Sequence, residues 1–277
     1  MSKVKVLYIS QEIKPFLPSS EVSKTVGLLS QSMQSKGKEV RVFMPRYGNV
    51  NERRHQLHEV IRLSGMNIII DDNDHSLIIK VASVPQTRMQ VYFIDNEDYF
   101  DSKEVVVDEN GDLLADNDEK AIFFSHGVLE TVKKLGWKPD VIHCHGWLAG
   151  LLPLYLKKHY QDDPHFSEAK IVTSLYSEGF NGSLDARLVE KLVKDGFDAK
   201  DLSLIEDPTF ENIQKLAVDY SDGVVLTSKE IESSLVDYVK ADDSKVLLDN
   251  PVEEEAMRVY SEYYDEIAGV GSSITEN

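Results

Sequence analysis

Two histidines stand on either side of the single cysteine of the chain, in the stretch Pro139–Gly150, which reads PDVIHCHGWLAG. The β-branched Val141 and Ile142 predict the start of a short buried strand, and the residues from 148 to 160 have the apolar spacing of a helix. Ligands of open α/β sheets bind at the carboxyl ends of the strands, where His143 and His145 would lie. The imidazoles could therefore serve catalysis or hydrogen-bond a ligand. The alternative is one histidine buried in the core and one in solvent.

Cys144 could be a nucleophile, although a small apolar side chain in a strand is the commoner role of a free cysteine. One cysteine cannot form an internal disulfide, so nothing in the sequence indicates an oxidising compartment. The apolar run at residues 4–9 is too short for a signal peptide, and no stretch approaches the about 20 apolar residues of a membrane span. We therefore expect a cytoplasmic protein without a membrane partner.

The charge balance narrows the choice of ligands. The 277 residues include 30 Lys and Arg against 48 Asp and Glu, so the net charge is 30 − 48 = −18. Nucleic acids and anionic membranes are bound through Lys and Arg, which argues against both as partners. A phosphorylated ligand would need a locally positive site. The acidic residues 101–118 lack the ligand spacing of a calcium loop and predict a solvated loop, and we expect neither a metal nor a cofactor.

Patterns of strands and helices alternate along the whole chain. Strands are predicted at residues 4–10, 39–44, 170–175, 223–227 and 245–248, besides the one that begins at Val141. Short strand-like runs at 66–70, 77–81 and 89–94 indicate a hairpin excursion, from which residues 90–95 rejoin the main sheet. Helices are expected from Glu21 to Gly37 and at 119–134, 148–160, 185–207, 210–219 and 229–240, the last capped by Ser228, and from Pro251 to about residue 267.

This alternation predicts an α/β fold, a doubly wound, Rossmann-like parallel sheet with helices on both faces and a small β-hairpin excursion. We expect residues 1–267 to form a single domain and residues 268–277 to be a disordered tail.

Five segments in this order resemble the N-terminal domain of bacterial glycogen synthases and plant starch synthases, which are glucosyltransferases of the GT-B type. The family's Ser-Glu-x-x-Pro is similar to the segment SQEIKP at 10–15, and its Lys-Thr-Gly-Gly-Leu loop to KTVGL at 24–28. The turn MPRY at 44–47 and the His-rich stretch 139–150 follow, and the run AVDYSDGVVLTS at 217–228 resembles the family's Ala-Asp-x-Val-x-Thr-Val-Ser.

The resemblance implies transfer of glucose from ADP-glucose to the end of an α-1,4-glucan. It implies that Lys24, Thr25 and Gly27 form a donor-binding loop at a helix start, where an ammonium and backbone N–H groups could face a pyrophosphate. Trp147 would offer an apolar face to a sugar. The alternatives are that Lys24 is an exposed helix lysine and that Trp147 belongs to the core.

Several positions depart from the family pattern. Val26 replaces the first glycine of the loop, and residues 18–23 resemble an insertion before the lysine. Gly146 stands in place of an aspartate that contacts the donor glucose, and Leu148 in place of a histidine. Tyr176 occupies the position of a histidine beside the reacting carbon, and a phenol cannot take a positive charge near pH 7. His143, His145 and Tyr176 remain the candidates for catalysis.

The family's enzymes carry a second Rossmann-like domain that supplies cations for the leaving phosphate, and nothing after Pro251 resembles it. The first hypothesis is accordingly an incomplete glucosyltransferase, inactive alone, which works with a separate C-terminal half or as a homo-oligomer. The second is a non-catalytic α-glucan-binding or regulatory protein derived from such a domain. The third is a generic α/β nucleotide-binding module.

Overall fold

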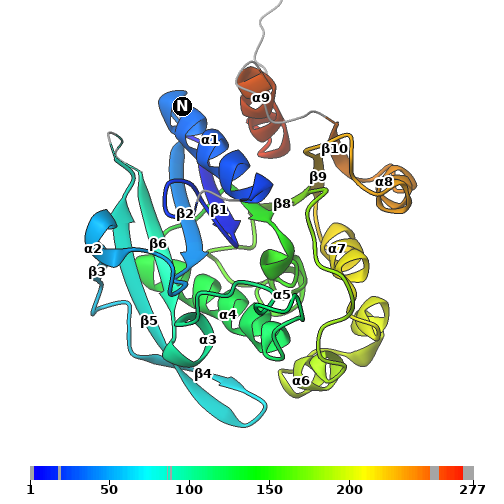
Figure 1. Ribbon diagram of the computed structural model, residues 1–277. Helices are drawn as coiled ribbons and strands as arrows, with labels where there is room; N and C mark the ends of the chain where they lie inside the picture. Colours follow the sequence, from blue (N-terminus) through cyan, green and yellow to red (C-terminus); the bar gives the residue numbers. More distant parts are fainter. Residues whose placement is uncertain (1–2, 18–19, 86, 88, 250–255, 271–277) are drawn as a thin grey trace, which may run out of the picture.

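The chain is organised around one ten-stranded sheet (Figure 1), seen in a computed structural model that describes residues 3–17, 20–85, 87, 89–249 and 256–270. The order of the strands is β10-β9-β8-β7-β1-β2-β6-β5-β3, and β4 pairs with β5 outside this path. The strands are β1 Lys5–Ser10, β2 Glu39–Pro45, β3 His58–Glu59, β4 Met66–Ile70, β5 Asn73–Ser83, β6 Gln90–Asp95, β7 Val141–His145, β8 Lys170–Leu175, β9 Gly223–Leu226 and β10 Val246–Asp249.

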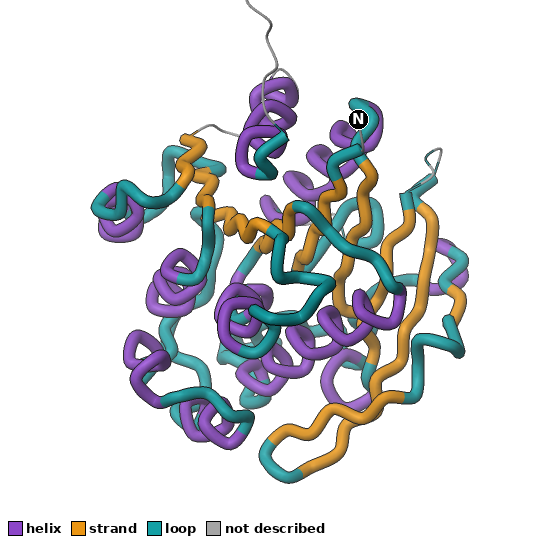
Figure 2. Tube along the Cα trace, turned by 180° about the vertical axis from the view of Figure 1, so that it is seen from behind, coloured by secondary structure: helices purple, strands orange, loops and turns teal. Residues whose placement is uncertain are grey.

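The seven strands β10-β9-β8-β7-β1-β2-β6 pair with one another in parallel throughout. Residues of β1, β7 and β8 are buried almost throughout, as expected for a sheet that helices cover on both faces. The predicted α/β fold with a parallel central sheet is thus confirmed. The hairpin excursion is present too, because β5 runs antiparallel to β6 and pairs with β4 in a hairpin that extends beyond the main sheet (Figure 2).

Helices α1 and α9 lie side by side on one face of the sheet (Figure 1), while α4 and α5 belong to the other. Capping residues explain where several of the helices begin or end. Ser20 caps α1 by accepting a hydrogen bond from the backbone nitrogen of Ser23, and Gly136 ends α4 in the left-handed region. The helices are α1 Glu21–Ser35, α2 Glu52–His55, α3 Glu97–Phe100, α4 Asn117–Leu135, η1 Trp147–Ala149, α5 Leu152–Lys158, α6 Leu188–Lys194, η2 Ala199–Ile205, α7 Phe210–Asp219, α8 Ser233–Lys240 and α9 Met257–Ile267.

Two predicted helices are each divided in the structure. The helix expected at 148–160 is a 3₁₀ turn, η1, followed by α5, because Pro153 favours a helix start and Gly150 fits closely against Ile213. The helix expected at 185–207 is α6 and η2, and Gly196 between them has a φ of 103° that ends α6.

The predicted start of the helix at Lys229 was wrong. The Ser228 hydroxyl accepts a hydrogen bond from the Glu230 nitrogen and so forms a turn, and α8 begins only at Ser233. The predicted start of the last helix at Pro251 lies outside the described residues, as do residues 271–277 of the expected disordered tail. Residues 268–270 close α9, where the nitrogens of Ala268, Gly269 and Val270 bond to carbonyls of its last turns.

Candidate functional site

The strand order reverses between β1 and β7, and this reversal marks the place where α/β sheets bind ligands. The chain leaves the carboxyl ends of β1 and β7 in opposite directions, toward β2 and β8 respectively. Ser10, His145 and Ser174 lie opposite one another at the ends of β1, β7 and β8. The structure thus brings both histidines to the carboxyl end of the sheet, as the sequence predicts.

His143 is completely buried, and both of its ring nitrogens are engaged. Nδ1 lies 2.6 Å from the Tyr264 hydroxyl of α9, and Nε2 lies 2.8 Å from the Ser174 hydroxyl. Burial, with the neighbouring His145, holds the pKa of His143 well below its ordinary value, so the imidazole is neutral. A neutral ring with two internal partners can orient its neighbours but has no nitrogen left for a ligand.

His145 is also completely buried, and its ring centroid lies 3.9 Å from that of His143. Nδ1 lies 2.6 Å from the Tyr176 hydroxyl, whereas Nε2 has no hydrogen-bond partner among the described residues. Burial lowers the pKa of His145 to about 3. Of the two histidines, His145 is therefore the one with a free ring nitrogen.

Tyr176 is buried directly after β8, and its phenol connects this strand to α1. Desolvation raises its pKa well above the ordinary value, while hydrogen bonds with the side chains of Ser174 and Thr25 oppose that rise. The buried Thr25 thus contacts the candidate catalytic residues, through Tyr176.

The sequence predicts Lys24 and Gly27 in a loop at the start of a helix, but the structure places both inside α1. The helix begins at Glu21, so Lys24 already lies inside it, and its backbone nitrogen bonds to the Ser20 carbonyl. A Cβ at Gly27 would lie 3.1 Å from the Cβ of Lys14, so this glycine allows the preceding loop to pack on α1. Lys24 is exposed and lines a cavity of about 610 Å³ with Gly27 and Lys14.

Carboxylates surround the first turn of α1, the position at which a helix attracts anions. The Glu21 nitrogen donates to Glu178 at 2.6 Å, and the Ser177 hydroxyl donates to Glu21 at 3.0 Å. The Ser20 hydroxyl donates to Glu12, whose pKa is raised chiefly by burial and also by the nearby Glu178. The chain's own side chains therefore supply the negative charge at this helix start.

Gly146 has a φ of 81°, and Gln11 fills the space in front of it. A Cβ at position 146 would lie 2.4 Å from the Oε1 atom of Gln11. The aspartate that the family pattern places there could not be accommodated unless Gln11 moved. Sequence reasoning identified Gly146 as a departure but missed Gln11, Glu178 and Tyr264, because no local pattern marks them.

A cavity of about 430 Å³ opens at the carboxyl ends of β8 and β9. Its wall includes Tyr176 and a row of edge-to-face aromatic rings, in which Phe180 lies 5.5 Å from Trp147 and 5.7 Å from Phe210. Trp147 itself is buried, so it supports Phe180 from below. Glu211 and Glu232 add acceptors to the same wall, and aromatic faces with a few polar groups are typical of small-molecule sites.

Two further features are absent from the described residues. None of their His, Cys, Asp and Glu side chains form a group of three or more that could hold a metal ion. Within the same part of the chain, no helix is long and apolar enough to cross a membrane.

Comparison with known proteins gives a consistent result. Residues 5–243 match the family model of the starch synthase catalytic domain. The chain is 42% identical over 190 residues to a glycogen synthase of Chlorobium limicola, covering 68% of this chain and 39% of the relative. It is 38% identical over 228 residues to a glycogen synthase of Chlorobium luteolum, covering 81% and 46%. The chain thus spans less than half the length of these relatives.

The fold is similar to the catalytic domain of starch synthase IV from Arabidopsis thaliana, solved with ADP and acarbose. The TM-score is 0.71 at 20% identity, over 92% of this chain and 53% of the other.

Proposed function

The chain belongs to the starch synthase catalytic domain family, and on this premise we propose that it forms one side of a glucosyltransferase cleft. The donor would be ADP-glucose, the acceptor an α-1,4-glucan and the compartment the cytoplasm. The observation that carries the proposal is the 2.6 Å contact between His145, at the β1–β7 reversal, and Tyr176, which also lines the aromatic cavity.

The aromatic cavity supports the acceptor side of the proposal. Faces of Phe180 and Phe210 can pack on the C–H groups of a sugar, while Glu211 and Glu232 can accept hydrogen bonds from its hydroxyls. A carboxylate-lined cavity suits a neutral glucan better than a phosphate, since like charges repel.

The donor side is incomplete in this chain. A departing nucleoside diphosphate needs cations or free helix N–H groups to stabilise its developing charge, and the first turn of α1 faces carboxylates instead. We therefore propose that transfer requires cationic residues from a C-terminal half, supplied separately or by another copy, and that Lys24 is this chain's contact with the donor phosphates. His145, oriented by Tyr176, would hydrogen-bond the donor sugar through Nε2.

Calorimetric titration tests the two halves of the proposal separately. Maltooligosaccharides should bind the full chain, and Phe210→Ala should weaken this binding, whereas Tyr220→Ala at the opposite end of α7 should not. ADP-glucose should bind weakly, and Lys24→Ala should abolish that binding, whereas Lys36→Ala, just beyond the end of α1, should leave it unchanged.

Incorporation of labelled glucose into glycogen then tests activity. The chain alone should be inactive and should gain activity when the C-terminal half of the Chlorobium limicola relative is added. Inactivity of the mixture despite binding of both ligands would contradict the enzyme hypothesis.

One structural feature favours a second candidate, a non-catalytic α-glucan-binding or regulatory protein. Glu178 and Gln11 occupy the positions next to α1 and Gly146 where donor contacts are expected. Glucan binding without any ADP-glucose binding would support this candidate. Nucleotide binding without a response to glucan would instead support a generic nucleotide-binding module.

A further inference from the structure

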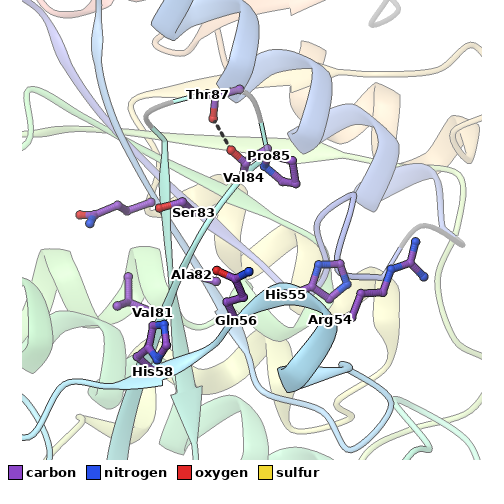
Figure 3. A pocket seen from close by; sticks show the side chains of 11 residues that line it. Arg54, His55, Gln56, His58, Val81, Ala82, Ser83, Val84, Pro85 and Thr87 are labelled. Carbon is purple, nitrogen blue, oxygen red and sulfur yellow. Dashed lines mark hydrogen bonds between the residues drawn. The ribbon is translucent and has the colours of Figure 1, made fainter.

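A third cavity, of about 500 Å³, lies between α2, β3 and the end of β5 (Figure 3). We propose that it binds a small phosphomonoester, a metabolite that carries one phosphate group and several hydroxyls. Its size is within the range of small-molecule sites. Figure 3 shows Gln56 between His58 on one side and His55 and Arg54 on the other, so groups that can bind a phosphate surround a polar centre.

The lining of this cavity contains no acidic residue, although the chain has 48 Asp and Glu. The two carboxylates nearest in the sequence point elsewhere. Glu52 lies 2.7 Å from the Lys80 ammonium and 3.4 Å from the Arg46 guanidinium. Glu59 lies opposite Lys80 in the sheet, whereas its neighbour His58 lies opposite Val81, and successive residues of a strand face opposite sides.

Arg54 is exposed, and its guanidinium forms no ion pair with any residue that the structure describes. Guanidinium groups bind phosphate through two parallel hydrogen bonds, and an imidazole N–H group adds a further donor. Arg54 and His58 therefore carry the phosphate-binding part of the proposal.

The cavity of about 610 Å³ beside α1, described above, adjoins this one and extends the positive surface. It shares Val84 and Pro85 with the cavity of about 500 Å³ and adds Lys14 and Lys24, and its lining again contains no acidic residue. Cavities lined by one sign of charge concentrate the electrostatic field and attract ligands of the opposite sign. In a chain of net charge −18, this local reversal of sign favours an anionic ligand.

The remaining polar side chains suit hydroxyl groups. Gln56, Ser83 and Gln90 line the cavity. The Gln90 Oε1 atom accepts a hydrogen bond from the Tyr92 hydroxyl at 3.3 Å, and the Thr87 hydroxyl donates to the Val84 carbonyl at 3.0 Å (Figure 3). Among the described residues, the Gln56 and Ser83 side chains and the Gln90 amide nitrogen are therefore available to a ligand. Amides and hydroxyls can both donate to and accept from a polyol. The carbon skeleton of the ligand would therefore lie toward Ser83 and Gln90.

Titration of the full chain with glucose 1-phosphate, inorganic phosphate and glucose tests the site. Glucose 1-phosphate should bind at least tenfold more tightly than either of the other probes. The double variant Arg54→Gln and His58→Gln should lose at least tenfold in affinity. Arg53→Gln, its neighbour on α2 outside the lining, should retain the affinity.

Three results would overturn the proposal. They are absence of glucose 1-phosphate binding, binding unaffected by the double variant, and equal affinity for inorganic phosphate or glucose. None of these results bears on the proposed glucosyltransferase cleft, whose test uses other ligands and variants.

Discussion

The Glu178 carboxylate lies 2.6 Å from the backbone nitrogen of Glu21, although the two residues are 157 positions apart in the chain. The first turn of a helix has unpaired N–H groups and a partial positive charge, and it binds anions such as phosphate for this reason. Here a side chain from the loop after β8 takes that role. The loop and α1 are thereby joined at the carboxyl edge of the sheet.

Glu178→Ala should expose the Glu21 N–H group to an added anion. A charge at a helix start contributes about 0.3–1 kcal/mol, so affinity for ADP should rise about two- to fivefold. Calorimetric titration with ADP measures this change, and Glu168→Ala, an exposed carboxylate on another loop, serves as the control. Equal ADP affinity of the two variants would show that Glu178 does not compete with a ligand.

Gly146→Asp should test whether Gln11 has replaced the family's carboxylate. The single variant should lose about 1–3 kcal/mol in its free energy of unfolding, because a side chain at φ 81° is strained and would overlap Gln11. Combining Gly146→Asp with Gln11→Gly should restore the part of the free energy of unfolding that the overlap of the two side chains had removed. Urea unfolding of both single variants and the double variant gives the coupling between the positions. Additive losses would mean that the two side chains do not compete for space.

Much of this fold could be predicted from the sequence, because strands and helices are encoded locally. The β-branched Val141 and Ile142 begin β7, and Glu21 begins α1, both where the sequence predicts. The contacts that define the site could not be predicted in this way. Tyr264 reaches His143 across 121 residues, and Glu178 reaches Glu21 across 157. The different surroundings of the adjacent Lys24 and Thr25 likewise depend on which neighbours α1 meets in the fold.

Tyr264→Phe should reveal how far α9 holds the histidine pair in place. The lost hydroxyl bonds both His143 Nδ1 at 2.6 Å and the Tyr8 hydroxyl at 3.0 Å, and all three side chains are buried. Leaving buried polar groups without partners costs about 1–3 kcal/mol. Urea unfolding should therefore show a loss of that size. An unchanged midpoint would indicate that water replaces the hydroxyl.

His145→Gln should change how stability depends on pH. The folded-state pKa of about 3 lies below the ordinary value near 6.5, so between these pH values only the unfolded chain takes up the proton. The stabilising contribution of neutral His145 is present above pH 6.5 and is lost as the pH falls toward 3. In this pH range, the free energy of unfolding of the variant should therefore fall by about 1.4 kcal/mol less per pH unit than that of the wild type. Urea unfolding of the wild type and the variant at pH 7, 6, 5 and 4.5 measures it.

Gln56→Gly should separate stability from ligand binding at the basic cavity. Gln56 ends α2 with a φ of 53°, a left-handed conformation that costs a non-glycine residue about 1–2 kcal/mol and that glycine adopts freely. The variant should accordingly unfold at a higher urea concentration than the wild type. If the Gln56 amide contacts the phosphomonoester, the same variant should bind glucose 1-phosphate more weakly. A gain in stability with unchanged affinity would assign the strained turn to the fold alone and remove Gln56 from the proposed site.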